Sequence, residues 1–231
     1  MGLFGLSFAV ALTAIHLALW RAPVVSGTVI ALRCALGALL VTVGLGLSLG
    51  SYFGWGLNLR AITLTHLHTA WGLVGWTVLL VAGVAYQVVP MFQITPPYPA
   101  WFVRGFAPLM AALLGAWSAF VLGGWTMAAT VTSAALAFGL AVLAGTTLYL
   151  LNRRRRKIGD ATLGYWRISM TSLLAGALLW LTTLVIPALA SAPQVELLLG
   201  ILLIFGFAVA VINGMAYKIV TFLAWFHLQA Q

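Results

Sequence analysis

The 231-residue chain is 64% hydrophobic and only 6% charged, with eleven basic and two acidic residues. Soluble globular proteins carry roughly a quarter charged residues, so this composition excludes an ordinary soluble enzyme and a disordered chain. Five basic residues form one run at 153–157, and the basic excess therefore indicates membrane orientation and no nucleic-acid partner. The single cysteine, Cys34, excludes an intramolecular disulfide. The two acidic residues, Asp160 and Glu196, leave no carboxylate pair for acid–base catalysis.

Charge-free stretches predict the membrane spans, because a transmembrane helix needs about 20 apolar residues. The prolines between 96 and 99 end one helix inside the stretch 61–103, and the pair Gly123-Gly124 divides the stretch 105–152 into two helices. We expect an all-α, polytopic, integral membrane helical bundle with seven transmembrane helices. The stretches that supply them are 1–20, 34–59, 61–103, 105–152, 168–195 and 197–217.

The two ends of the chain allow more than one interpretation. Residues 1–20 are either a retained helix or a signal peptide, and the lack of a basic region before the apolar run favours the helix. Residues 219–231 are too short to span, so they either extend the last helix or lie at the membrane interface. No repeat with a period of 20–50 residues is evident. We expect a single domain over residues 1–231, either complete or part of a longer protein or larger complex.

The basic residues predict the orientation of the bundle. Arg60 lies alone on one side of the membrane. The other ten lie on the opposite side: Arg21, Arg33, Arg104, Arg153, Arg154, Arg155, Arg156, Lys157, Arg167 and Lys218. The positive-inside rule makes this basic side cytoplasmic, so we expect the N-terminus outside and the C-terminus inside. The expected location is the bacterial inner membrane, as a multi-pass protein.

Four histidines are the only abundant candidates for metal ligands. His66 and His68 fall at the outer end of the third predicted helix, whereas His16 and His227 fall near the inner side, roughly 30 Å of hydrocarbon away. On a regular helix His66 and His68 point roughly 200° apart, so one faces the bundle and the other faces the interface or a partner. An ionisable residue inside a membrane bundle is a functional candidate. His16 and His227 are more typical of interfacial hydrogen-bonding residues.

Small residues follow the histidines on the same helix. Gly72 and Gly75 lie four and seven residues after His68 and share a face with it. Gly83 continues that face three helical turns beyond Gly72. This glycine face leaves room either for a flat ligand such as a porphyrin or for a neighbouring helix.

This segment resembles the second transmembrane helix of the haem–copper oxidase superfamily, above all that of cbb3-type oxidases and bacterial nitric oxide reductases. The matching residues are Arg60, His68, Thr69, Gly75, Gly83, Tyr86, Val88, Val89 and Pro90. The resemblance implies that His68 ligates a low-spin haem b near the outer face, with Arg60 beside a haem propionate. Arg60 is equally typical of an arginine that extends its guanidinium to the membrane interface. The residues expected around the cofactor are His68 (the metal ligand), His66, Arg60, Thr69, Gly72 and Gly75.

The rest of the chain departs from that family. The last predicted span has no histidine, so the family's copper ligands and its second low-spin haem ligand have no counterparts. We therefore expect haem b without copper, and no oxygen or nitric oxide reduction by this chain alone. The function indicated is respiratory electron transfer by a membrane haem protein. Its expected partners are the lipid bilayer, a partner subunit or a second copy of the chain, and a quinone or cytochrome as redox partner.

Two other functions stay open. One is a cofactor-free scaffold or accessory subunit of a larger complex. The other is a small secondary transporter, which the absence of repeated halves disfavours. Tyr86, Gln87 and Gln93, toward the inner end of the third predicted helix, either line a quinone pocket or proton path or bond between helices. Lys218 is expected to extend its amine to the cytoplasmic interface.

Overall fold

A computed structural model describes residues 2–56, 60–155 and 158–229, the side chains of residues 2–9 and of Pro187 excepted. Six stretches of continuous helix within these ranges are long and apolar enough to cross a membrane. They are Gly27–Trp55, Ala61–Gln93, Ala100–Gly123, Thr126–Asn152, Ala161–Val185 and Pro193–Gln229. The predicted all-α fold with several membrane-spanning helices agrees with this arrangement.

The first predicted span corresponds to α1 (Gly2–Trp20). Its part with described side chains, Val10–Trp20, is an apolar helix shorter than a membrane span. The count of seven spans and the direction of insertion therefore stay predictions. Arg156 and Lys157 of the basic run lie outside the described residues.

Proline and glycine set the helix boundaries where the sequence predicts them. α4 (Leu79–Gln93) ends before the proline cluster, and α5 (Ala100–Gly123) begins directly after Pro99. Gly124 follows with a left-handed φ of 75°, a conformation that a side chain would strain. α6 (Thr126–Asn152) begins two residues later, so the boundaries predicted from the proline cluster and the glycine pair are confirmed.

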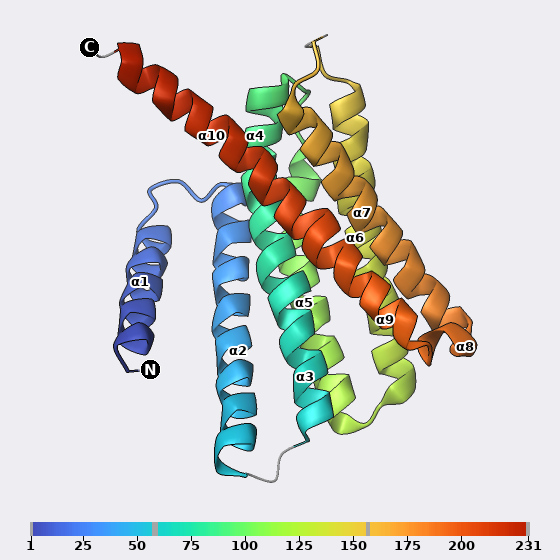
Figure 1. Ribbon diagram of the computed structural model, residues 1–231. Coiled ribbons are helices and arrows are strands. Elements are labelled where there is room, and N and C mark those ends of the chain that lie inside the picture. The colour runs from blue at the N-terminus through green and yellow to red at the C-terminus, as the bar shows by residue number, and fades with distance from the viewer. Residues whose placement is uncertain (1, 57–59, 156–157, 230–231) are drawn as a thin grey trace. The chain divides into compact units, whose positions relative to one another are not determined.

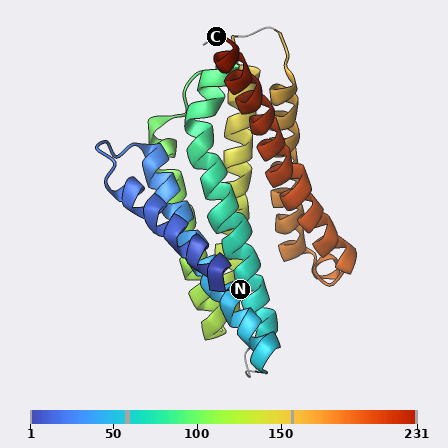
Figure 2. The same ribbon diagram turned by 60° about the vertical axis from the view of Figure 1, so that its left-hand side comes forward.

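The chain divides into two compact units, each of which combines two segments of sequence. The first unit comprises residues 1–87 and 99–132, and the second comprises residues 88–98 and 133–231. The expectation of a single domain stays a prediction. Within the first unit, α1 lies against α2 (Gly27–Trp55), as Figure 2 shows.

One long helix, which belongs to the first unit up to residue 87, carries the segment of interest. α3 (Ala61–Ala70), η1 (Trp71–Val78) and α4 follow one another without a break (Figure 1). η1 is a π-helix, in which backbone hydrogen bonds join residues five apart and the turn is wider than in an α-helix. α2 packs along both α3 and η1, and α5 also contacts these elements. α2 is therefore the principal neighbour of the histidine segment.

The second unit contains a similar pair of helices. α7 (Ala161–Val185) packs against η2 (Ile201–Val209), a second π-helix, and against α10 (Ala210–Gln229). The short helices α8 (Pro187–Ala190) and α9 (Pro193–Gly200) lead from α7 into η2. α9, η2 and α10 form one continuous helix (Figure 1). Of the two interpretations of the C-terminal residues, extension of the last helix is the one observed, as far as Gln229.

Ser26 begins α2 as its N-cap, with its Oγ 3.3 Å from the backbone N–H of Val29. We expect Ser26→Ala to lower the free energy of unfolding by about 1 kcal/mol, because one backbone donor at the helix start loses its partner. Thermal unfolding in detergent measures this change. Ser51→Ala is the control, since the Ser51 hydroxyl bonds only to the Leu47 carbonyl of its own helix. Equal effects of the two substitutions would contradict the capping role.

Candidate functional site

His68 is half-buried in the first unit, at the end of α3 and three residues before η1. Its Nδ1 lies 3.0 Å from the backbone carbonyl oxygen of Thr42 in α2. A carbonyl oxygen only accepts hydrogen bonds, so Nδ1 is the donor, and in a neutral ring of this tautomer Nε2 is the nitrogen with the lone pair. An imidazole held in this way can present Nε2 to a metal ion or accept a proton there.

A glycine in α2 makes room for this imidazole. A Cβ atom at Gly46 would lie 3.1 Å from Cε1 of His68 and 3.5 Å from its Nδ1. Thr42 and Gly46 are one helical turn apart, so they lie on the same side of α2. We call these two residues the His68 seat. A larger side chain at position 46 would push the ring away from the Thr42 carbonyl.

Three of the expected cofactor residues are exposed: Arg60, His66 and Thr69. His66 and His68 thus have different surroundings, as the angle between residues two apart on a helix requires. Arg60 is the residue before α3 and makes no side-chain capping bond to that helix. The structure therefore does not gather the expected residues around one point.

The glycine face packs directly against α2. A Cβ at Gly75 would lie 2.8 Å from Cβ of Ala38, and a Cβ at Gly83 would lie 2.9 Å from Cβ of Ala31. At Gly72 the nearest side-chain atom of α2 would be 3.4 Å away. Such short separations mean that the glycines serve the close approach of two helices. Of the two interpretations of this face, the neighbouring helix is the one observed, and α2 fills the space that a porphyrin would need there.

The π-helix η1 begins three residues after His68. The Thr77 hydroxyl donates to the Gly72 carbonyl at 2.9 Å, and the indole N–H of Trp71 donates to Ser118 Oγ in α5 at 2.9 Å. These bonds satisfy polar groups that the apolar interior would otherwise leave unpaired. π-Helical turns are uncommon and frequently occur at functional sites. His68 is thus followed by a segment whose unusual geometry is held by side-chain hydrogen bonds.

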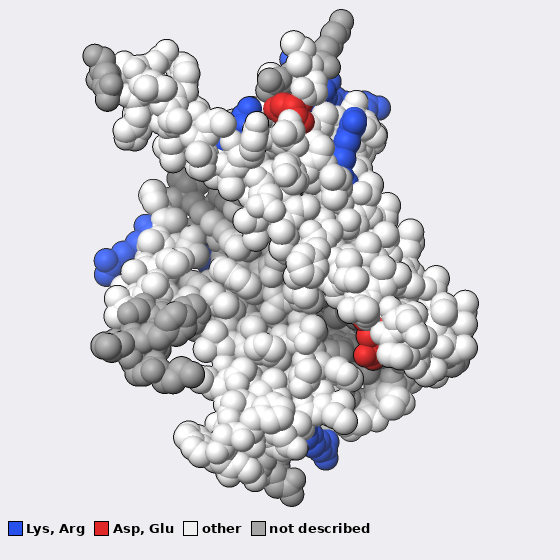
Figure 3. Space-filling view, in the orientation of Figure 1, with Lys and Arg blue, Asp and Glu red and all other residues white. Residues whose placement is uncertain are grey.

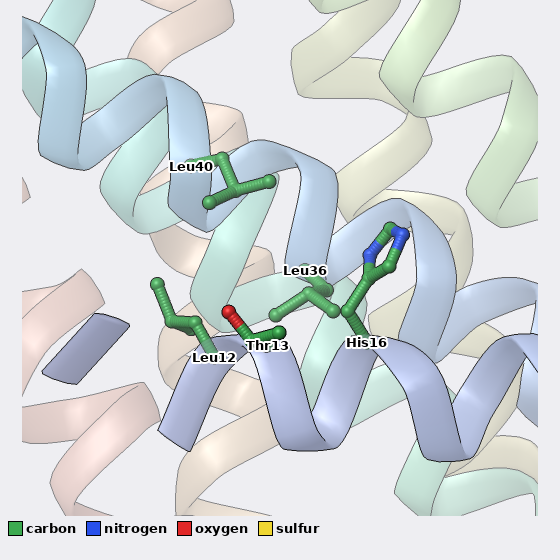
Figure 4. A pocket seen from close by; sticks show the side chains of 5 residues that line it. All are labelled: Leu12, Thr13, His16, Leu36 and Leu40. Carbon is green, nitrogen blue, oxygen red and sulfur yellow. The ribbon is translucent and has the colours of Figure 1, made fainter. Parts of the chain in front are cut away.

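His16 and His227 have surroundings of their own. His16 belongs to a pocket of about 200 Å³ between α1 and α2 (Figure 4), and its ring centre is 5.7 Å from that of Trp20. The residues that line this pocket are Leu12, Thr13, His16, Leu36 and Leu40. His227 is exposed, and its Nδ1 is 3.1 Å from the Leu223 carbonyl of the same helix. Among the described residues, no group of three or more histidine, cysteine or acidic side chains could hold a metal ion.

Asp160 is the centre of a polar cluster in the second unit. Its Oδ1 accepts the backbone N–H of Leu163 at 2.8 Å and so caps α7. The same oxygen accepts a bond of 3.3 Å from Nε2 of Gln93, which is fully buried. Lys218 Nζ lies 3.7 Å from Oδ2 of Asp160, and Arg154 donates to Oε1 of Gln93 at 3.5 Å. The cluster joins the ends of α4, α6 and α7 to α10.

Sequence reasoning found the members of this cluster only in part. Gln93 bonds between helices, which is one of its two predicted roles, and Lys218 pairs with a carboxylate. The aspartate before an apolar helical run is a typical N-cap signal, and it could have identified Asp160 as a cap. Charged groups are scarce elsewhere: on the face drawn in Figure 3 they form only a few small groups on an uncharged surface.

Tyr98 lies in the connection between α4 and α5 and is buried. Its hydroxyl is 3.0 Å from Oγ1 of Thr147. Thr147 donates its own proton to the Leu143 carbonyl at 2.8 Å, so Tyr98 is the donor to Thr147. Burial raises the pKa of Tyr98 above its ordinary value, because the phenolate would lose its hydration. Tyr98 therefore stays neutral at physiological pH and links two segments of the second unit.

These features define a helical protein of the multi-pass membrane type, with one histidine oriented by a backbone carbonyl of a neighbouring helix. No family model, no curated protein and no solved structure matches the chain. The resemblance to the haem–copper oxidase helix therefore stays a prediction. The residues present fit an iron ligand at His68, because the Thr42 carbonyl holds Nδ1 and leaves Nε2 as the nitrogen that can ligate, but the face that carries Gly72 and Gly75 does not fit a porphyrin.

Proposed function

We propose that this protein binds haem b within the membrane through His68 and acts in electron transfer. The observation that supports the proposal most directly is the hydrogen bond between His68 Nδ1 and the Thr42 carbonyl. Histidines that ligate metals commonly donate their second ring N–H to a carbonyl or carboxylate, which fixes the tautomer and increases ligand basicity. When bound, haem b supplies reversible one-electron transfer.

The residues of this chain have separate roles in the proposal. Thr42 and Gly46 hold the imidazole, and His68 supplies Nε2 to the iron. Arg60, exposed before α3, is suited to pair with a propionate, because a guanidinium binds carboxylates through two parallel bonds. Gly72 and Gly75 are not part of the proposed site, since α2 covers them. A quinone or a cytochrome is the class of redox partner that such a protein needs.

The orientation belongs to the same proposal. We infer that α1 is a seventh span, that the N-terminus is outside, and that the protein resides in a bacterial inner membrane with a partner subunit or a second copy. The support is the distribution of the basic residues, with Arg60 alone at one side of the alternating helices. In this orientation His68 lies toward the outer surface.

The test is the absorption spectrum of the detergent-purified chain from haem-replete cells, with a pyridine haemochrome assay. We expect a Soret band in the native chain, its loss in His68→Ala, and its retention in His227→Ala, because His227 is an exposed residue of another unit. Size-exclusion chromatography shows whether each variant stays folded.

A native chain without haem, or a band unchanged in folded His68→Ala, would overturn the proposal. The second candidate, a cofactor-free scaffold or accessory subunit, would then stand. Its support is the glycine face, which packs on α2 as an ordinary helix contact.

A further inference from the structure

We propose that the chain is a tandem duplication of one three-helix unit, and that only the first copy keeps an open histidine site. The first copy consists of α1, α2 and the helix that begins at Ala61. The second consists of α6, α7 and the helix that begins at Pro193, and α5 connects the two. The statement about duplication stands on its own, whereas the statement about the site rests on the proposed haem function.

The starts of α2 and α7 match in their caps and in the position of one arginine. Ser26 caps α2, and Asp160 caps α7 in the same way. Seven residues after each cap stands an arginine. Arg33 donates to the Leu19 carbonyl at 2.8 Å, near the end of α1. Its counterpart Arg167 donates to the side chain of the last residue of α6 at 3.5 Å. Both arginines therefore reach the C-terminal end of the preceding helix, where a cation is favoured.

The glycine contacts repeat in the same register. Gly75 meets Ala38 in the first unit, and Gly206 meets Ser172 in the second. Ala38 follows the cap Ser26 by the same number of positions as Ser172 follows the cap Asp160. In both pairs a Cβ on the glycine would lie under 3.0 Å from the Cβ of its neighbour. One face of a long helix thus contacts its partner at the same point in each unit.

A second glycine, eight residues further along each helix, extends the correspondence. Gly83 meets Ala31 and Gly214 meets Tyr165, and these two contacts keep the same separations along the chain. Two contacts at a matched spacing fix both the rotation and the register of a helix pair. The pair formed by α2 and the helix that begins at Ala61 therefore packs in the same way as the pair formed by α7 and the helix that begins at Pro193.

The π-helices agree with this register. When η1 is moved along the chain by the step that takes Gly75 to Gly206, it falls on 202–209, and η2 occupies Ile201–Val209. Identical residues recur at the same spacing along the two helices. The pairs are Leu67 and Leu198, Gly75 and Gly206, Val78 and Val209, Gly83 and Gly214, Ala85 and Ala216, Tyr86 and Tyr217, and Val89 and Val220. A π-helix is rare, so two at one equivalent position favour common origin over chance.

The copies differ at the His68 seat. The position equivalent to His68 is Leu199, and the position equivalent to Gly46 is Trp180. The first copy thus pairs an imidazole with a glycine, whereas the second pairs a leucine with an indole. Trp180 donates its N–H to Ser133 Oγ at 2.9 Å, so the indole is used within the second unit. In the second copy a tryptophan stands in the place of Gly46. The combination of a histidine with a facing glycine therefore occurs in the first copy alone.

Disulfide cross-linking tests the duplication in a Cys34→Ser background. Thr42 and Gly176 follow their caps by the same number of residues, and Gly72 and Leu203 are equivalent in the proposed register. A Cβ at Gly72 would lie 3.4 Å from Cγ2 of Thr42, and a Cβ at Gly176 would lie 3.7 Å from Cγ of Leu203, which leaves room for a disulfide. We expect Thr42→Cys with Gly72→Cys, and separately Gly176→Cys with Leu203→Cys, to form an intramolecular bond under mild oxidation. Gly44→Cys with Gly72→Cys and Leu178→Cys with Leu203→Cys are the displaced controls, because a shift of two residues turns the side chain to another face. Failure of the second-unit pair, or equal bonding in the controls, would overturn the duplication.

Haem content tests the statement about the site. We expect one haem per chain, and its loss in Gly46→Trp, which copies the second unit into the first. Gly44→Trp is the matched control, since nothing lies within 4 Å of a Cβ there. Full haem in Gly46→Trp, or two haems per chain, would overturn the single open site while leaving the duplication standing. A native chain without haem would instead reject the proposed function itself, and the cross-links would still decide the duplication.

Discussion

Asp160→Ala is expected to lower the free energy of unfolding by about 2–4 kcal/mol, the larger of the two main stability effects. The substitution removes the N-cap of α7, worth about 1 kcal/mol. It also takes an acceptor from the buried Gln93 amide, which costs about 1–3 kcal/mol when a buried donor loses its partner. Lys218, only partly exposed, loses its carboxylate. Thermal unfolding in detergent measures the loss.

Two further variants separate the contributions of Asp160. Asp160→Asn keeps an oxygen that can cap the helix but removes the charge, so it should cost less than Asp160→Ala. Lys218→Met keeps the cap but removes the ion pair, together with the contact of the ammonium over the Phe92 ring at 5.7 Å. It should cost about 1 kcal/mol or less, because the pair is partly exposed. If all three substitutions had equal effects, the cluster would act only through its charge.

Gly214→Ala is expected to destabilise the protein by about 1–3 kcal/mol, the usual range for overpacking a close contact. A Cβ at this position would lie 2.5 Å from Cβ of Tyr165, an atom that cannot move without the backbone of α7. The helices would have to separate or α10 would have to rotate. Thermal unfolding and the protease resistance of the second unit both report this change.

The matched control is Gly164→Ala, next to Tyr165 in α7. It introduces the same methyl group where nothing lies within 4 Å. Alanine favours a helix over glycine by about 1 kcal/mol, so this variant should be neutral or slightly stabilising. A destabilisation of Gly164→Ala equal to that of Gly214→Ala would show that loss of glycine, and not the contact with α7, explains the result.

Helix positions follow from the sequence because their causes are local. A charge-free run of sufficient length predicts a span, and the prolines before Ala100 and the glycine at 124 set boundaries by their own backbone restrictions. Helical periodicity also groups His68 with Gly72 and Gly75 on one face. Periodicity does not say what covers that face, and the covering helix α2 comes from packing. The structure therefore does not gather the expected cofactor residues around one point, although the sequence groups them.

Other features escape sequence reasoning for different reasons. The side-chain partners of Asp160, Gln93 and Lys218, lie far along the chain on either side, and nothing local marks them. The proposed repeat has a period far longer than the 20–50 residues of common repeat proteins. The step along the chain from α2 to α7 is also three residues longer than the step between the two long helices that carry Gly75 and Gly206. A search for short fixed periods therefore misses it. Such a repeat would also remove the absence of repeated halves as an argument against transport.

The continuous helix from Pro193 to Gln229 has 37 residues and is about 56 Å long. Membrane helices tilt by up to about 40° from the bilayer normal. Even at that tilt, the length of helix inside a hydrocarbon layer of about 30 Å is only about 39 Å. About eleven residues, at 1.5 Å each, must then protrude. If they are the last ones, they begin just past Lys218, whose amine sits beside the start of α7. Three exposed aromatic residues follow Lys218: Phe222, Trp225 and Phe226. Their rings would then lie at the membrane–water interface and fix the depth at which the helix is inserted.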